Sequence, residues 1–264
     1  MLCFMKYVFV FTLVFASCTP SKKASETMSF ASNPVIAHRG AFRKNNYPEN
    51  SIAALKEAIR LKCTGSEFDI RMSVDDTPLI NHDPQYHGHD IEKTSYRDLS
   101  QIKLSNGEVL PTLRQFLLAG LENNRSTRLV VEIKPSASKE RGKIIAEKVV
   151  QLVSQLNARS MVVYISFDYD ILKKVHELDP QASTQYLNGE LPPDQVKADG
   201  INGLDYHISV FRLHPEWVDS AHKLGLILNA WTVNSETDMR WLIERKFRFI
   251  TTNEPELLLG IYKE

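Results

Sequence analysis

The stretch of sequence that decides the fold is Leu129-Val130-Val131-Glu132-Ile133-Lys134. Successive side chains of a β-strand point to opposite faces, so the apolar side chains at positions 129, 131 and 133 share one face, while Glu132 and Lys134 share the other. The apolar face is expected to pack against helices. Glu132 and Lys134 are then expected to face the interior of a barrel, near the strand end where barrel enzymes place their active sites.

Seven further strand-like runs surround this one, and helix-like patterns lie between them. The eight predicted strands are Val35–Ala37, Ser66–Ile70, Leu129–Ile133, Met161–Ile165, Thr184–Leu187, Ile201–Leu204, Ile227–Trp231 and Phe249–Thr251. Strands that alternate with helices favour parallel βα units, and 264 residues are enough for one closed barrel. We therefore predict a (β/α)8 TIM barrel. An open, doubly wound sheet stays as the alternative, because periodicity does not show whether a sheet closes.

One segment interrupts the alternation after the second predicted strand. Pro78-Leu79-Ile80-Asn81-His82 follows Asp75-Asp76-Thr77, a turn-rich link that is too short for a crossover helix. We expect this segment to fold back as a hairpin or to lie across the barrel mouth. Residues 83–110 are then expected to form a small, irregular insertion.

The first 17 residues are typical of an export signal. Lys6 precedes an apolar run from Tyr7 to Phe15, which is too short to span a bilayer and is followed by Ala16-Ser17-Cys18. Small residues directly before a cysteine look like a bacterial lipobox, so we expect cleavage before Cys18 and lipid on its thiol. An ordinary cleavable signal and an uncleaved anchor are the alternatives.

The predicted organisation is a lipoprotein signal peptide over 1–17, a flexible tether over 18–33 and one barrel domain over 34–264. The tether is rich in Ser, Ala and Lys and lacks apolar periodicity. A lipid on Cys18 anchors an exported protein to a membrane, and the lysines after it give no sign of an acidic surface-export tag. We therefore expect a lipoprotein that faces the periplasm of a Gram-negative bacterium.

The overall charge carries little information about partners. Lys plus Arg and Asp plus Glu each number 32, so no net charge attracts the chain to nucleic acid, and no nucleic-acid partner is expected. If Cys3 is removed and Cys18 is lipidated, only Cys63 remains, so no disulfide within the chain is expected. The sequence leaves the oligomeric state open.

Three carboxylates are expected to converge in the barrel. By the same alternation, Glu67 and Asp69 of the second strand point inward, as Glu132 does on the third. Clustered carboxylates are costly unless a cation lies among them, and oxygen ligands alone favour a hard cation, Ca²⁺ or Mg²⁺. Structural ion pairs of Glu67 with Arg71 or Lys134 are the alternative.

Two histidines lie at segments that should meet at the same barrel mouth. His38 ends the first strand, with Arg39 and Gly40 after it, and His82 ends the segment that folds back. Two imidazoles can supply the base and the acid that cleavage of a phosphodiester needs, and the Arg39 guanidinium can bind its non-bridging oxygens. A zinc site at His82, His87 and His89 is disfavoured, because their segment is loop-like and no cysteine is near.

These motifs together resemble the glycerophosphodiester phosphodiesterase family, over nearly all of the chain from about Val35 to Pro255. The matching motifs are His38-Arg39-Gly40, Pro48-Glu49-Asn50, Glu67-Phe68-Asp69, His82-Asp83 and Glu132-Ile133-Lys134. The resemblance implies that Glu67, Asp69 and Glu132 hold the metal and that Lys134 binds phosphate. It also implies that His38 and His82 form the acid and base pair, without settling which is which.

The resemblance places two further residues in the pocket. Glu49 belongs to the site, near the metal or on the substrate, while Asn50 or Ser51 can also simply cap the following helix. Trp231, at the end of the seventh predicted strand, is expected to form a wall of the glycerol pocket, with ordinary core packing as its alternative. Many relatives carry aspartate at the position of Asn253, which is a departure in this chain.

The activity that the resemblance implies is metal-dependent hydrolysis of glycerophosphodiesters to glycerol 3-phosphate and an alcohol. One alternative is a phospholipase D or sphingomyelinase D type of phosphodiesterase that acts on intact lipids. Another is a lipoprotein that binds a phosphorylated ligand without turnover. A second histidine argues against mere binding, since a binding protein does not need an acid and base pair.

Overall fold

The computed structural model describes residues 1, 2 and 28–263. The predicted lipobox with Cys18 lies outside the described residues, as do nearly all of the predicted signal peptide and the first part of the tether. Within the described part of the chain, no helix combines the length and the apolar character needed to cross a bilayer.

Eight parallel strands of the described residues form a closed barrel. They are β1 (Val35–Ala37), β2 (Gly65–Met72), β6 (Arg128–Ile133), β7 (Val162–Ser166), β8 (Ser183–Tyr186), β9 (Gly203–His207), β10 (Ile227–Trp231) and β11 (Phe249–Thr252). The order around the barrel is β1-β11-β10-β9-β8-β7-β6-β2, and pairing of β1 with β2 closes it. The predicted TIM barrel is therefore confirmed, and the open-sheet alternative is wrong.

Helices connect the strands and surround the barrel. They are α1 (Ile52–Arg60), α3 (Leu113–Leu121), α4 (Lys139–Gln155), α5 (Tyr169–Leu178), α6 (Pro193–Ala198), α7 (Ile208–Leu213), α8 (Pro215–Leu224), α9 (Glu236–Glu244) and α10 (Pro255–Ile261), with a short 3-10 turn, Arg159–Met161, before β7. Side-chain caps mark where several of them begin: Ser51 caps α1, and Thr112 forms a capping box with Gln115 at α3. Each such cap is worth about 1 kcal/mol of stability.

The alternation of side chains along the strands divides the core into an outer and an inner part. Phe68 and Val131 pack outward against the helices in one large apolar cluster, while Val130 points inward, where it packs with Ile36 and Phe249. The apolar inner cluster fills one part of the barrel interior. The polar inward side chains occupy the rest of the interior, where the cavity described below lies. This confirms the directions predicted for the second and third predicted strands.

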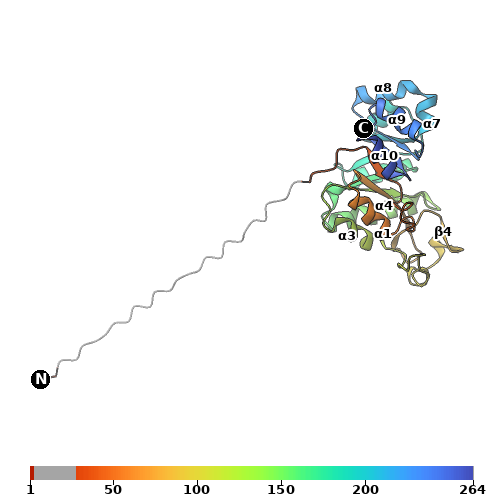
Figure 1. Ribbon diagram of the computed structural model, residues 1–264. Coiled ribbons are helices and arrows are strands. Elements are labelled where there is room, and N and C mark those ends of the chain that lie inside the picture. The colour runs from red at the N-terminus through yellow and green to blue at the C-terminus, as the bar shows by residue number, and fades with distance from the viewer. Residues whose placement is uncertain (3–27, 264) are drawn as a thin grey trace.

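The segment after β2 folds back, as expected. β3 (Pro78–Ile80) pairs antiparallel with β2, and the insertion that follows protrudes at one side of the barrel (Figure 1). The insertion holds β4 (Gln85–Tyr86), β5 (His89–Asp90), a 3-10 turn (Ile91–Lys93) and α2 (Tyr96–Leu99). A small apolar cluster of its own supports it, formed by Leu79, Tyr86, Ile91, Leu99 and Leu110.

Two elements near residue 205 differ from the sequence-based prediction. The predicted strand Ile201–Leu204 lies at Gly203–His207, and the short helix α7 directly after it was not predicted. Glycine interrupts the apolar pattern at the strand start, but Gly203 is needed there, because a Cβ at this position would lie 2.6 Å from the Ile227 carbonyl oxygen. Asp205, which the prediction left outside the strand, is therefore part of β9, and its side chain points into the barrel.

Candidate active site

Three buried carboxylates converge on the inward-facing side of β2 and β6. Glu67 and Asp69 lie on β2, and Glu132 lies beside Asp69 in the register of the two strands. One oxygen from each lies within 4.8 Å of the others, and all three side chains are buried. Glu67 Oε1 is fully enclosed and has no hydrogen-bond partner among the residues that the structure describes. This is the donor set that a hard cation prefers.

The electrostatics of the cluster favour an added cation. Burial, with the nearby Asp69, raises the pKa of Glu67 well above its ordinary value, and it raises the pKa of Glu132 to about 7. Burial also opposes ionisation of Asp69, but Lys134 and Arg39 outweigh it and lower its pKa to about 2. Two of the three acids are thus held back from ionising, and a bound divalent cation would reverse this.

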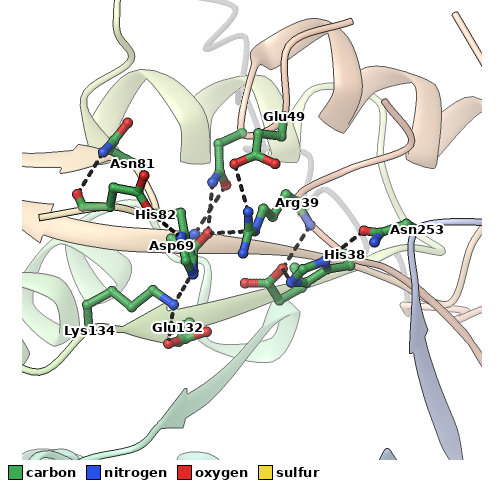
Figure 2. A network of polar contacts seen from close by, with 12 residues as sticks. His38, Arg39, Glu49, Asp69, Asn81, His82, Glu132, Lys134 and Asn253 are labelled. Atoms are coloured by element: carbon green, nitrogen blue, oxygen red, sulfur yellow. Dashed lines mark hydrogen bonds and ion pairs between the residues drawn. The ribbon is translucent and has the colours of Figure 1, made fainter. Parts of the chain in front are cut away.

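Lys134 and Arg39 lie against the acidic cluster (Figure 2). The Lys134 Nζ atom is 2.8 Å from Asp69 Oδ1 and 2.6 Å from Glu132 Oε1. Arg39 Nε is 3.5 Å from Asp69 Oδ2, and the Arg39 backbone N–H donates to Glu67 Oε2 at 2.8 Å. If all three acids ionise, these two cations leave one negative charge of the cluster without a partner. Ion pairs with Lys134 and Arg39 are thus present in the cluster. They do not make a metal ion unnecessary, because they do not balance the charge of three ionised carboxylates.

The loop after β1 brings Glu49 and Asn50 to the site. Arg39 Nη1 donates to Glu49 Oε1 at 2.7 Å (Figure 2). Asn50 Nδ2 donates to Asp69 Oδ2 at 2.8 Å, and its Oδ1 accepts from the Asp69 backbone at 3.2 Å. The helix cap is Ser51, so Asn50 orients a carboxylate instead. Gly40 permits the tight loop, because its φ is +83° and a Cβ there would lie 2.7 Å from Ala54.

His38 is held by the side chain of Asn253. Its Nδ1 is 2.7 Å from Asn253 Oδ1 (Figure 2). Since an amide oxygen only accepts, Nδ1 carries the proton and Nε2 keeps its lone pair, 3.9 Å from Glu67 Oε2. Burial, aided by Arg39, lowers the pKa of His38 to about 4. His38 is therefore neutral at physiological pH.

His82 occupies a more open environment at the other side of the carboxylates. Its Nδ1 is 2.7 Å from Asp83 Oδ1, and 36% of its side chain is exposed. Arg71 Nε donates to the His82 carbonyl oxygen at 2.8 Å, which fixes the loop to β2. The predicted convergence of the two histidines is thus present, with 17% of the His38 side chain exposed against 36% of that of His82.

These residues line one side of a cavity of about 110 Å³, and mainly apolar residues line the other side. Its charged half consists of His38, Arg39, Glu67, His82, Glu132 and Lys134. The opposite half is mainly apolar and is formed by Ile165, Phe167, Leu187 and Trp231, together with Asp205, Thr232 and Thr251. The Trp231 ring packs edge-on against Phe167, with 5.3 Å between ring centres, and Trp231 lines the cavity. Asp205 is a pocket residue that the sequence-based prediction missed.

Similarity to known proteins agrees with this site. A profile of the glycerophosphoryl diester phosphodiesterase family matches residues 38–257 of the chain. The chain belongs to this family. A glycerophosphodiester phosphodiesterase of Caldanaerobacter subterraneus is 29% identical over 245 residues, which cover 87% of this chain and 98% of the relative. The predictions of the family and of the enzyme class, a phosphoric diester hydrolase, are confirmed.

Solved structures of this family match the barrel closely. A glycerophosphodiester phosphodiesterase from Parabacteroides distasonis has a TM-score of 0.85 and 37% identity, covering 89% of this chain and 98% of its own. A phosphodiesterase from Oleispira antarctica, solved with its product sn-glycerol-3-phosphate, has a TM-score of 0.77 at 22% identity, covering 87% of this chain and 96% of its own. At that identity, the second likeness bears on the fold alone.

Proposed function

We propose that this member of the glycerophosphoryl diester phosphodiesterase family hydrolyses glycerophosphodiesters to glycerol 3-phosphate and an alcohol, with a divalent cation, Ca²⁺ or Mg²⁺, held by Glu67, Asp69 and Glu132. The observation that carries the proposal is the cluster of three buried carboxylates with an enclosed, unpaired oxygen, beside two histidines. A cation in that cluster supplies positive charge to the phosphate oxygens and orients them.

Arg39 and Lys134 are the proposed phosphate-binding residues. Both side chains line the cavity, and both carry positive charge that their carboxylate neighbours reinforce: the pKa of each is raised despite burial, chiefly by Asp69. In a site with little water, such fixed charges stabilise the negative charge that develops in the transition state. Glu49 holds the Arg39 guanidinium in place and is proposed to act through it.

We assign the base to His38 and the acid to His82. His38 is mostly buried and neutral, and its Nε2 lone pair is available to take a proton from the attacking oxygen. His82 is 36% exposed, and the Asp83 carboxylate beside its Nδ1 orients the ring for giving a proton to the leaving alkoxide. The different surroundings of the two imidazoles are the reason why we assign proton uptake to His38 and proton donation to His82.

His82 lines a second hollow as well as the cavity. This hollow, of about 210 Å³, is lined by Glu49, His82 and residues of the insertion: Asn81, Asp83, Gln85, Tyr86 and His87. We propose that the small glycerol group enters the enclosed cavity next to Trp231, while the alcohol of variable size leaves through the hollow. In the proposed orientation, the departing oxygen would lie next to the proposed acid.

The test is a comparison of substrates at matched concentration with added Ca²⁺ or Mg²⁺. We expect turnover of glycerophosphocholine and glycerophosphoethanolamine, and of glycerophosphoinositol to some extent, with little on diacyl lipids or phosphomonoesters. A preference for lysophospholipid or sphingomyelin over every glycerophosphodiester would assign the chain a phospholipase D type of activity instead. Binding of these compounds without any turnover would make it a phospho-ligand-binding protein.

We also propose that the protein is exported and anchored to a membrane through lipid on Cys18, facing the periplasm. The support is the short apolar run followed by small residues and a cysteine. Mass spectrometry of the mature protein from its native host should show lipid on Cys18, and Cys18→Ser should remove it. An unmodified Cys18 in mature protein would contradict the proposal.

A further inference from the structure

Asp205 is a buried acid in the cavity that the proposed mechanism does not use. It lies in the middle of β9, where its neighbours Leu204 and Tyr206 point outward into the main apolar cluster, so Asp205 points into the barrel. Its side chain is 1% exposed and lines the cavity. Its Oδ1 has no hydrogen-bond partner in the part of the chain that the structure describes.

The groups around Asp205 account for only part of its hydrogen-bonding capacity. The Asn229 side chain, on the neighbouring strand β10, bonds to the carboxyl group. The Trp231 indole N–H donates to the Asp205 backbone oxygen at 2.9 Å, so it does not reach the side chain. The other residues that line this half of the cavity are mainly apolar, including Ile165, Phe167 and Leu187.

An unpaired polar group in such a place is costly for the folded protein. A buried oxygen that lacks its hydrogen bond loses about 1–3 kcal/mol relative to a paired one. Burial and the nearby Glu132 also raise the pKa of Asp205 well above its ordinary value, which favours the protonated form, and a protonated carboxyl group can both donate and accept. An aliphatic side chain would fill the space without this cost. The oxygen is therefore explained best by a ligand.

We propose that Asp205 binds a hydroxyl group of the substrate's glycerol and so selects phosphodiesters of a small polyol over those of a plain alkyl alcohol. The inference rests on the proposed function and adds the residue that recognises the substrate. Glycerol alternates C–H and O–H groups along a short chain. The cavity offers the matching partners: the Phe167 and Trp231 rings for the C–H groups, and the Asp205 carboxyl group for a hydroxyl.

The carboxyl group is not explained as a fourth metal ligand. The cluster of candidate ligand atoms within 4.8 Å of one another, searched among the described residues, consists of Glu67, Asp69 and Glu132, without Asp205. Asp205 stands on β9, and β7 and β8 lie between β9 and β6, the strand that carries Glu132. Its position thus suits the part of the substrate beyond the phosphate.

The experiment measures kcat/KM for glycerophosphocholine and for two analogues, each lacking one hydroxyl of the glycerol group. The wild-type enzyme should prefer glycerophosphocholine over at least one analogue by about 10²-fold, because a site built to pair a hydroxyl rejects a ligand that lacks it. Asp205→Leu should reduce that preference to within about threefold, chiefly by losing activity on glycerophosphocholine. Asp205→Asn, which keeps a donor and an acceptor, should retain most of it.

Gln185→Leu is the matched control. Gln185 is also a buried, inward-pointing residue with an unpaired oxygen, on the adjacent strand, but it does not line the cavity, so its replacement should leave the preference unchanged. Equal losses on all three substrates in Asp205→Leu, or a raised metal requirement with the preference intact, would overturn the proposal.

The wild-type enzyme alone provides a second test that does not depend on the folding of any variant. If it hydrolyses the three compounds equally well, Asp205 does not select a hydroxyl. If it hydrolyses none of them, the proposed function fails first, and the recognition proposed for Asp205 fails with it. Loss of discrimination and loss of activity are therefore distinguishable outcomes.

Discussion

The cavity has a charged half, whose acids stand on β2 and β6, and an apolar half, built on β7 to β11 and the residues just after them. The charged half concentrates groups whose pKa values are shifted by burial and by one another. The apolar half is mostly aromatic and aliphatic, with Asp205 as its buried acid. The contrast suggests a division of labour in which one half performs the chemistry and the other recognises the substrate. Substitutions in the two halves should then affect different kinetic constants.

The largest effect is expected from the metal ligands of the charged half. Glu67→Gln or Glu132→Gln should lower kcat/KM about 10³-fold at low metal concentration, since several kcal/mol of charge stabilisation depend on the cation. Activity should recover in part as Ca²⁺ or Mg²⁺ is raised. The control is Glu122→Gln, an exposed carboxylate paired with Lys56. Unchanged activity and metal requirement in the ligand variants would rule out these ligands.

The next largest effect is expected from the histidines. His38→Ala and His82→Ala should each lower kcat on the order of 10²-fold or more, the usual scale for a lost acid or base. His222→Ala serves as the control, because His222 bonds to a backbone oxygen, Arg245 O, away from this cavity. Near-normal turnover in a folded variant of either histidine would remove it from the mechanism.

A smaller effect is expected in the apolar half. Trp231→Ala should raise KM for glycerophosphocholine by about tenfold with less change in kcat, because it removes a wall that contacts substrate and transition state alike. Trp217→Ala, which removes an indole that packs against His214 outside the cavity, is the comparison. If Trp231→Ala instead lowers kcat as strongly as the histidine variants do, the two halves do not divide the work as described.

The smallest effect concerns stability and pH. Burial raises the pKa of Glu132 from 4.5 to about 7, so the folded protein binds this proton more tightly than the unfolded chain does. Protonation of Glu132 therefore stabilises the fold. That contribution is complete below about pH 4.5 and is lost as the pH rises through about 7. In chelator, the free energy of unfolding should therefore fall across this window by on the order of 1 kcal/mol, a few degrees in melting temperature.

Added Ca²⁺ or Mg²⁺ should remove this fall, since a cation binds the ionised carboxylates. Thermal melts at about pH 5 and about pH 7.5, with and without metal, measure it. If the melting temperature in chelator rises with pH, or if added metal does not change it, the carboxylate cluster is not a cation site.

The charged half could be predicted from the sequence because its residues lie in short motifs at strand ends. Alternation along β2 and β6 places Glu67, Asp69 and Glu132 on one face, and a barrel brings that face to one mouth. Asp205 was not predicted as a pocket residue, because its strand was predicted to end at Leu204. The bond between His38 and Asn253 joins residues 215 positions apart, which local patterns do not show. Asn50 was ambiguous, since both a helix cap and a carboxylate contact suit its position.

The most direct test of the central claim is to follow hydrolysis of glycerophosphocholine by phosphorus NMR in metal-free protein, and then after addition of Ca²⁺ or Mg²⁺. The account predicts no turnover in chelator and, once metal is restored, formation of glycerol 3-phosphate with release of choline. Full turnover in chelator, with no residual metal by elemental analysis, would contradict the role of Glu67, Asp69 and Glu132. Formation of phosphocholine and glycerol would contradict the proposed direction of cleavage.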